Sequence, residues 1–359
     1  MKQHLKDVKN YQPGKPLEEL AREYGIKDAV KMASNENALG PSPKALAAIR
    51  KSLPRVHRYP EGGCFYLRQK LSKALKVSPD QLIFGNGSDE LLVFAARAIV
   101  GEGDEVIIAD PTFLIYEIAT QVEGGTVVKV PMKNFQYDLD GMRRKIGPKT
   151  KLIFIANPDN PIGTFVSEKK LRAFLEAVPK NIVVVVDEAY YEFARIEKSY
   201  PDSLKWISSF PNLIVTRTFS KAYGLTGLRV GYAVASAELV KDLNKVREPF
   251  NVNSVAQVGA TAALDDKKHL SRTVKMTTEG RAYLKTELQK LGFDCVDTVT
   301  NFVLADMKQD AKKLYEALLK KGVIVRPMAA WGMNTFIRVT VGKPAENKRF
   351  LTALKETLK

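Results

Sequence analysis

The sequence has little that would cross-link the chain, bind a metal ion or cross a membrane. Its 359 residues include two cysteines, Cys64 and Cys295, which lie far apart and fit no CxxC or Cys/His pattern. The longest apolar runs, such as 182–186, are too short to span a bilayer, and the polar stretch 1–10 lacks the apolar core of a signal peptide. We therefore expect a cytoplasmic protein with no disulfide framework and no metal site.

Low-complexity stretches are also missing, since Gly (23) and Pro (18) occur at near-average frequency, so the whole chain is expected to fold. What the chain has in excess is positive charge, with 56 Lys and Arg against 40 Asp and Glu. This excess is compatible with a basic nucleic-acid-binding module. The cations are spread along helical stretches such as 267–290 and 308–321, however, which favours a solvated basic surface and no nucleic-acid partner.

Short β-branched runs alternate with segments whose apolar residues recur every three or four positions. The predicted strands are 82–84, 106–109, 126–130, 152–155, 182–186, 213–216 and 229–235, and the predicted helices are 88–100, 112–121, 139–146 and 167–178. Ser88 and Ser167 are predicted to be helix N-caps. The alternation predicts an α/β fold, with a large domain built on a mostly parallel central sheet flanked by helices.

Beyond residue 235 the pattern changes to longer charged helices, at 253–264 and 269–291, and then to a mixed segment at 302–358. This change predicts a smaller α+β domain at 246–359 that follows a large cofactor-binding domain at 36–245. Residues 1–35 contain one predicted helix, 17–24, between prolines and a glycine. We expect them to form an arm that packs on the small domain or on a partner subunit.

Lys221 follows a predicted buried strand, in the segment 218–225 (TFSKAYGL). A lone lysine at such a position is ordinarily a solvated loop residue. Here Thr218 and Ser220 can donate hydrogen bonds to a phosphate, and Arg229 adds a fixed cation for the same anion. A phosphate site beside an amine is what pyridoxal phosphate linked to a lysine requires.

Asp187 ends a very apolar predicted strand, and strand ends are where open α/β sheets bind ligands. It can be a simple helix cap, or it can hold a pyridine nitrogen protonated. Tyr190 can bind the phenolic oxygen of the same ring, with Tyr191 as the competing candidate. In an earlier turn-rich segment, 157–164 (NPDNPIGT), Asn160 can donate to that oxygen or belong to an ordinary loop.

Two further segments fit the same cofactor. The strand, glycine turn and helix start at 84–90 (FGNGSDE) can present backbone N–H groups to an anion, although many nucleotide sites share this arrangement. Phe113, after another predicted strand, can stack on a flat heteroaromatic ring or belong to the core.

In this order, and with Arg338 near the C-terminus, these elements resemble the class I/II, fold type I pyridoxal-phosphate aminotransferases. Within that group the chain is most similar to the histidinol-phosphate aminotransferases, through 11–16 (YQPGKP), 33–37 (ASNEN), 58–60 (RYP), 87–90 (GSDE), 187–190 (DEAY) and 217–225 (RTFSKAYGL). The resemblance covers essentially the full chain. Ala38, Ile162 and the loop 329–333 depart from the usual pattern.

The resemblance implies a role for each matching residue. Lys221 is the Schiff-base lysine and proton shuttle, Asp187 pairs with the pyridine nitrogen, and Tyr190 and Asn160 bind the phenolic oxygen. Phe113 stacks on the ring, and Tyr59 reaches the phosphate from the other subunit of a homodimer with shared active sites. The remaining implied contacts are to the cofactor phosphate, from Ser88, Asp89, Thr218, Ser220 and Arg229, and to the substrate, from Tyr11, Asn160, Arg326 and Arg338.

The implied reaction is amino transfer between two pairs of compounds in histidine biosynthesis. One pair is L-histidinol phosphate and imidazole acetol phosphate, and the other is glutamate and 2-oxoglutarate. Transamination of phenylalanine or tyrosine is the alternative, because aromatic pocket walls discriminate weakly between an imidazole and a phenyl ring. Decarboxylation of threonine phosphate would use the same cofactor contacts. A non-enzymatic basic module would not explain Lys221, Asp187 and Arg229 together.

Overall fold

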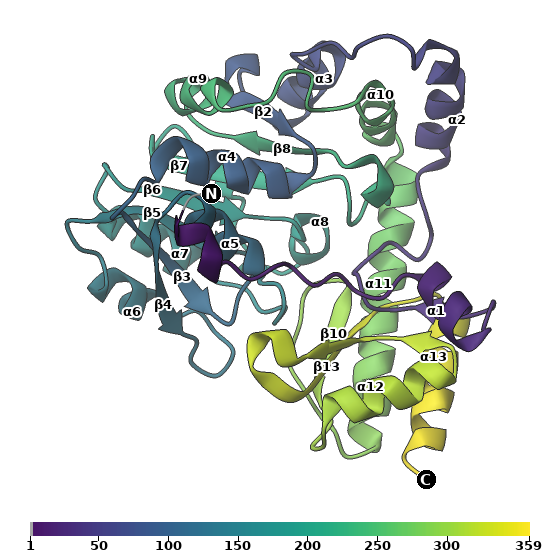
Figure 1. The fold of residues 1–359 in the computed structure, drawn as a ribbon. Helices are drawn as coiled ribbons and strands as arrows, with labels where there is room; N and C mark the ends of the chain where they lie inside the picture. Colours follow the sequence, from purple (N-terminus) through teal and green to yellow (C-terminus); the bar gives the residue numbers. More distant parts are fainter. Residues whose placement is uncertain (1–2) are drawn as a thin grey trace.

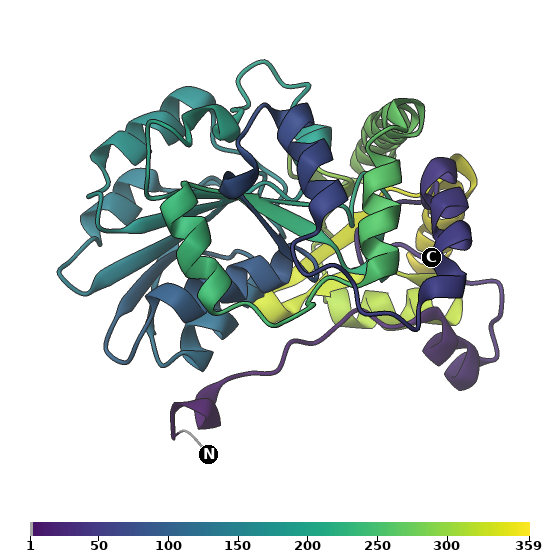
Figure 2. The same cartoon turned by 90° about the horizontal axis from the view of Figure 1, so that it is seen from above.

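A seven-stranded sheet forms the centre of the computed structural model, which describes residues 3–359 (Figures 1 and 2). In spatial order its strands are β2 (Leu82–Gly85), β8 (Gly231–Val234), β7 (Leu213–Thr218), β6 (Val183–Asp187), β5 (Thr150–Ala156), β3 (Glu105–Asp110) and β4 (Thr126–Pro131). β8 runs antiparallel to β2 and β7, and the other neighbours pair in parallel. The predicted α/β fold with a mostly parallel sheet is confirmed.

Helices cover both faces of this sheet, because successive strand residues point to opposite sides. In β5, Leu152 and Phe154 pack in one apolar cluster, and Ile153 and Ile155 pack in another. The first cluster lies under α4 (Ser88–Ile99), α5 (Leu114–Val122) and α9 (Ala237–Lys245). The second lies under α3 (Phe65–Leu75), α6 (Leu139–Arg144), α7 (Glu168–Ala177) and α10 (Ser254–Ala263), which packs on α2 (Pro43–Ser52).

A second, antiparallel sheet has the strand order β12 (Arg326–Met328), β13 (Met333–Thr340), β10 (Phe302–Asp306), β9 (Asp294–Cys295). It packs with α11 (Lys267–Lys290), α12 (Ala311–Lys320) and α13 (Pro344–Thr357) around a separate apolar cluster. The long helix α11 runs from the large sheet region down beside this smaller one (Figure 1). The pocket described below lies between the two regions.

The N-terminal segment touches both regions. The short helix at Gln3–Asp7 lies against α5, where the His4 ring and the Val122 carbonyl oxygen are 3.1 Å apart. The chain then crosses to α1 (Leu17–Tyr24) beside the smaller region (Figure 1), and β1 (Val30–Lys31) pairs in parallel with β11 (Val323–Ile324).

Three sequence-based boundaries were wrong at residues that matter for the site. Gly87, not Ser88, is the N-cap of α4, because a φ of 88° at this position favours glycine. Helix α5 begins at Leu114, since Phe113 before it is extended. Arg229 lies outside β8 with a φ of 55°, in a left-handed conformation that ends the preceding short helix. Ser167 does occupy the N-cap position of α7, although its side chain makes no capping hydrogen bond.

Among residues 3–359, no helix combines the length and the apolar character needed to cross a membrane.

Candidate active site

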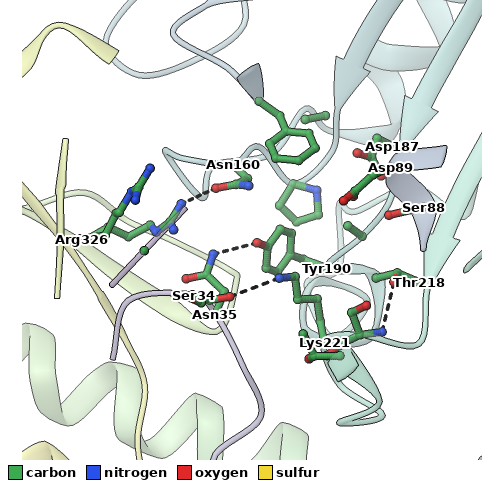
Figure 3. Close-up of a pocket in the computed structure, with 18 of the residues that line it drawn as sticks. Ser34, Asn35, Ser88, Asp89, Asn160, Asp187, Tyr190, Thr218, Lys221 and Arg326 are labelled. Atoms are coloured by element: carbon green, nitrogen blue, oxygen red, sulfur yellow. Dashed lines mark hydrogen bonds between the residues drawn. The ribbon is translucent and has the colours of Figure 1, made fainter. Parts of the chain in front are cut away.

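A pocket of about 150 Å³ lies where the carboxyl ends of β5, β6 and β7 face β12 and β13 (Figure 3). All the predicted site residues except Tyr59 line it. They are Tyr11, Ser88, Asp89, Phe113, Asn160, Asp187, Tyr190, Thr218, Ser220, Lys221, Arg229, Arg326 and Arg338. The fold thus brings together side chains that are separated by more than 300 positions in the sequence.

Lys221 follows the end of β7 and points its amine into the pocket (Figure 3). The Nζ atom donates to the Ser34 carbonyl oxygen at 3.4 Å. Burial, opposed by Asp89 and assisted by Arg338, lowers the pKa of the Lys221 amine to about 8. The amine is therefore easier to deprotonate than that of an exposed lysine, which favours a role as a nucleophile or a base.

Asp187 is the last residue of β6 and is almost completely buried. Its two carboxylate oxygens accept different hydroxyl donors: Thr216 Oγ1 at 2.8 Å and the Tyr116 hydroxyl at 3.0 Å. Burial raises the pKa of Asp187 to about 6, and these two hydrogen bonds act in the opposite direction. The carboxylate thus retains its charge at neutral pH within an apolar setting.

The start of helix α4 and the loop after β7 form an anion-binding corner. Arg229 donates to Asp89 Oδ2 at 3.1 Å and to the Ser220 hydroxyl at 3.3 Å. A side chain at Gly87 would lie 2.2 Å from the Arg229 guanidinium, so only glycine lets these groups approach. Free N–H groups at a helix start and a nearby guanidinium are the usual partners of a phosphate.

Tyr190 and Asn160 line the pocket and are hydrogen-bonded to side chains that lie across it from Asp187 (Figure 3). Asn35 Nδ2 donates to the Tyr190 hydroxyl at 2.8 Å, and Arg338 Nη1 donates to Asn160 Oδ1 at 2.5 Å. The side-chain amide of Asn160 therefore keeps its own N–H groups available for the pocket.

The competing candidate, Tyr191, does not line this pocket. Its ring lies 3.3 Å from the guanidinium carbon of Arg217 and faces a separate cavity of about 1290 Å³. The structure thus places Tyr190, and not its neighbour, beside Lys221 and Asp187.

Arg326 and Arg338 are direct partners in the pairing of β12 with β13. Both are largely buried, and neither forms an ion pair with a carboxylate anywhere in residues 3–359. Arg326 donates to the Gln12 carbonyl oxygen at 2.6 Å, and Arg338 donates to the Ala33 carbonyl oxygen at 3.1 Å, while its Nε has no partner. Two buried guanidinium groups without a counter-charge favour binding of an anion here.

Sequence reasoning missed several pocket residues. Ser34 and Asn35 line the pocket and contact Lys221 and Tyr190 through the hydrogen bonds given above. They belong to the segment 33–37 that carries the family resemblance, but no local pattern assigns them a contact. Tyr116 and Thr216, the partners of Asp187, read as ordinary helix and strand positions.

Tyr59 lies outside the pocket. It is 84% exposed and stacks on Phe250, with the two ring centroids 4.9 Å apart. Ile162, which departs from the usual family pattern, is fully buried with Leu304 and Met328, so this departure lies in the apolar contact between the two regions and not in the pocket lining.

The side chains that line the pocket fit pyridoxal phosphate. An amine, a buried carboxylate, hydrogen-bond donors, an aromatic ring and a phosphate-binding corner surround one small space. In the described part of the chain, no cluster of three or more His, Cys, Asp or Glu side chains is arranged to hold a metal ion.

Comparison with known proteins gives a consistent result over the whole chain. The family model "Aminotransferase class I and II" matches residues 27–354. A histidinol-phosphate aminotransferase of Moorella thermoacetica is 48% identical over 98% of this chain and 91% of its own length. Histidinol-phosphate aminotransferase 1 of Nitrosococcus oceani is 49% identical over 97% of this chain and 94% of its own.

Among solved structures, the histidinol-phosphate aminotransferase of Sinorhizobium meliloti in complex with pyridoxal-5'-phosphate superposes with a TM-score of 0.91. It is 29% identical in sequence, and the match covers 100% of this chain and 97% of the other.

Proposed function

The chain belongs to the class I and II aminotransferases, which have the fold type I architecture and use pyridoxal 5'-phosphate, and from this premise we propose its reaction and substrates. The proposed reaction transfers the amino group between L-histidinol phosphate and 2-oxoglutarate, giving imidazole acetol phosphate and glutamate. The names of the relatives at 48% and 49% identity support this substrate pair.

The observation that carries the proposal is the pair of buried guanidinium groups, Arg326 and Arg338, that lack a carboxylate partner in residues 3–359. A phosphate monoester carries close to two negative charges at pH 7 and accepts several charge-assisted hydrogen bonds. Two neighbouring arginines therefore match a phosphorylated substrate. A carboxylate of glutamate can use the same groups in the second half of the reaction, with Tyr11 beside them.

When bound, the cofactor supplies an aromatic ring that accepts the negative charge released when a substrate C–H bond breaks. Lys221 would provide the amine that attaches the cofactor and the base that takes the proton from the α-carbon of the substrate. The buried charge of Asp187 would favour a protonated ring nitrogen, and Tyr190 and Asn160 would donate hydrogen bonds to the phenolic oxygen. Phe113 would stack on the ring.

The residues that we group around the phosphate of the cofactor are Ser88, Asp89, Thr218, Ser220 and Arg229. Of these, Arg229 supplies the fixed positive charge, and the start of α4 supplies backbone N–H groups. Because Asp89 is acidic, we assign to it the task of orienting Arg229 rather than direct contact with the anion.

We also propose a homodimer with shared active sites, in which Tyr59 contacts the cofactor phosphate of the partner subunit. Large apolar side chains near Tyr59 are exposed, including Leu53, Val56, Phe65 and Phe250. Mixing inactive Lys221→Ala chains with Tyr59→Ala chains should restore activity, because half of the sites in a hybrid would be intact. Absence of any restored activity in a verified hybrid would contradict sharing.

Half-reactions test the substrate directly. The purified, cofactor-loaded protein is mixed in turn with histidinol phosphate, phenylalanine and threonine phosphate, and the change in the visible spectrum of the cofactor is followed. Fast conversion with histidinol phosphate and slow conversion with phenylalanine is expected. The reverse order would favour an aromatic amino-acid aminotransferase, and release of carbon dioxide from threonine phosphate would favour the decarboxylase.

A further inference from the structure

Both oxygens of the Asp187 carboxylate are already engaged by hydroxyl groups of the chain. Thr216 is the direct partner of Asp187 in the parallel pairing of β6 with β7, so the sheet itself fixes the 2.8 Å contact to Oδ1. Tyr116 reaches Oδ2 at 3.0 Å from helix α5, on one face of the sheet. Two independent elements therefore define the position of one carboxylate.

Aromatic packing fixes the position of Tyr116 in addition to its hydrogen bond with Asp187. It is fully buried, and its ring is parallel to that of Phe154, with an interplanar angle of 4° and ring centroids 4.7 Å apart. Its other neighbour is Phe113, whose ring meets it edge-on with centroids 5.7 Å apart. Tyr116 thus contacts both the carboxylate that we assign to the ring nitrogen and the aromatic side chain that we assign to a face of the ring.

We propose that Tyr116 and Thr216 are positioning residues that clamp Asp187 in one orientation and keep it ionised for the cofactor ring nitrogen. This inference rests on the role proposed for Asp187. A buried carboxylate without hydrogen-bond donors is more stable in its protonated, neutral form. A neutral carboxyl group would not stabilise a proton on the ring nitrogen of the cofactor.

The balance of effects at Asp187 supports this assignment. Burial is the largest influence on the pKa of Asp187, and it favours the neutral form. The hydrogen bonds from Thr216 and Tyr116 are the next largest, and both favour the charged form. Removing either hydroxyl therefore leaves burial less opposed, and removing both leaves the smaller effect of the Ala189 backbone N–H to oppose it.

Two hydroxyl deletions test the clamp while preserving side-chain shape. Tyr116→Phe keeps the ring stack, and Thr216→Val keeps a β-branched side chain in the strand. Each is expected to weaken cofactor binding to the cofactor-free protein by about tenfold, since hydrogen bonds to a charged group are stronger than those between neutral groups. The bound cofactor should also show a shifted visible absorption band, because its ring nitrogen is less protonated. Thr216→Ser, which retains the hydroxyl, should bind cofactor like the parent.

Tyr232→Phe is the matched control, because Tyr232, in strand β8, is also a buried tyrosine but does not line the pocket. It should lower thermal stability as the other deletions do, with cofactor affinity and spectrum unchanged. Asp187→Asn serves as the reference. If Asp187→Asn is impaired while Tyr116→Phe and Thr216→Val match the parent in affinity and spectrum, the clamp is refuted and the role of Asp187 stands. Parent-like behaviour of Asp187→Asn itself would refute the role of Asp187.

Discussion

The two halves of the pocket are built by different means. The cofactor half, formed by Asp187, Lys221 and Arg229, uses the ends of β6 and β7 and the loop that follows. The substrate half, formed by Arg326 and Arg338, uses side chains that face each other across an antiparallel strand pair of the smaller sheet. Strand ends present short local motifs, whereas in the strand pair the register decides which side chains become neighbours. We therefore propose that the first half serves chemistry common to many substrates and that the second half selects among substrates.

Among changes in the cofactor half, Lys221→Ala should cause the largest loss of activity. The variant should still bind pyridoxal phosphate noncovalently but lose transamination with every substrate, because a proton-transfer group typically contributes about 10²–10⁴-fold and the attachment point is lost as well. Borohydride reduction of the parent, followed by peptide mapping, should label Lys221. An adduct on any other lysine would contradict the assignment.

Asp187→Ala should come next, with turnover reduced by about 10²–10³-fold for all substrates, as for the loss of one preorganised electrostatic contact. The fold should be retained, and Asp187→Glu should be less impaired because it keeps the charge. Turnover and circular dichroism of both variants check this. A parent-like rate in Asp187→Ala would show that Asp187 has only a structural role.

The substrate half should respond selectively. Arg326→Ala should cost histidinol phosphate about 2 kcal/mol, roughly thirtyfold in kcat/KM, and leave phenylalanine nearly unaffected because phenylalanine has no phosphate. Arg338→Ala should impair histidinol phosphate, phenylalanine and glutamate together. Lysine should be a poor replacement at either position, since it cannot form the bidentate contact. Equal losses for phenylalanine and histidinol phosphate in Arg326→Ala would count against a phosphate-binding role.

The last prediction concerns the stability of the cofactor-free protein, to which the buried carboxylate of the cofactor half contributes. The pKa of Asp187 in the folded chain, about 6, lies above its ordinary value of 3.8, so the folded state binds more protons between these pH values. Stability contributed by Asp187 is therefore lost as the pH rises through this window. Asp187→Asn should raise the free energy of unfolding by about 1–3 kcal/mol at pH 8 and change it little near pH 4. Urea denaturation at the two pH values, with Asn160→Ala as a pocket control, measures this difference.

Much of the cofactor half was predictable from the sequence. Lys221 among hydroxyl residues, Asp187 after an apolar strand and Phe113 after another strand each carry a local pattern, and strands that end at one sheet edge must bring them together. The partners of these residues were not predictable. Asn35 reaches Tyr190, and Tyr116 reaches Asp187, across contacts that no spacing encodes.

The sequence by itself determined the alternation of strands and helices, and with it the α/β fold, because hydrophobic periodicity and turn residues are local properties. It also determined which residue types accompany Lys221. Only the tertiary structure decided between Tyr190 and Tyr191, since adjacent residues near a strand end point to different cavities. Only it placed Arg326 opposite Arg338, because that register depends on the pairing of two strands and on the bulge between Pro327 and Met328.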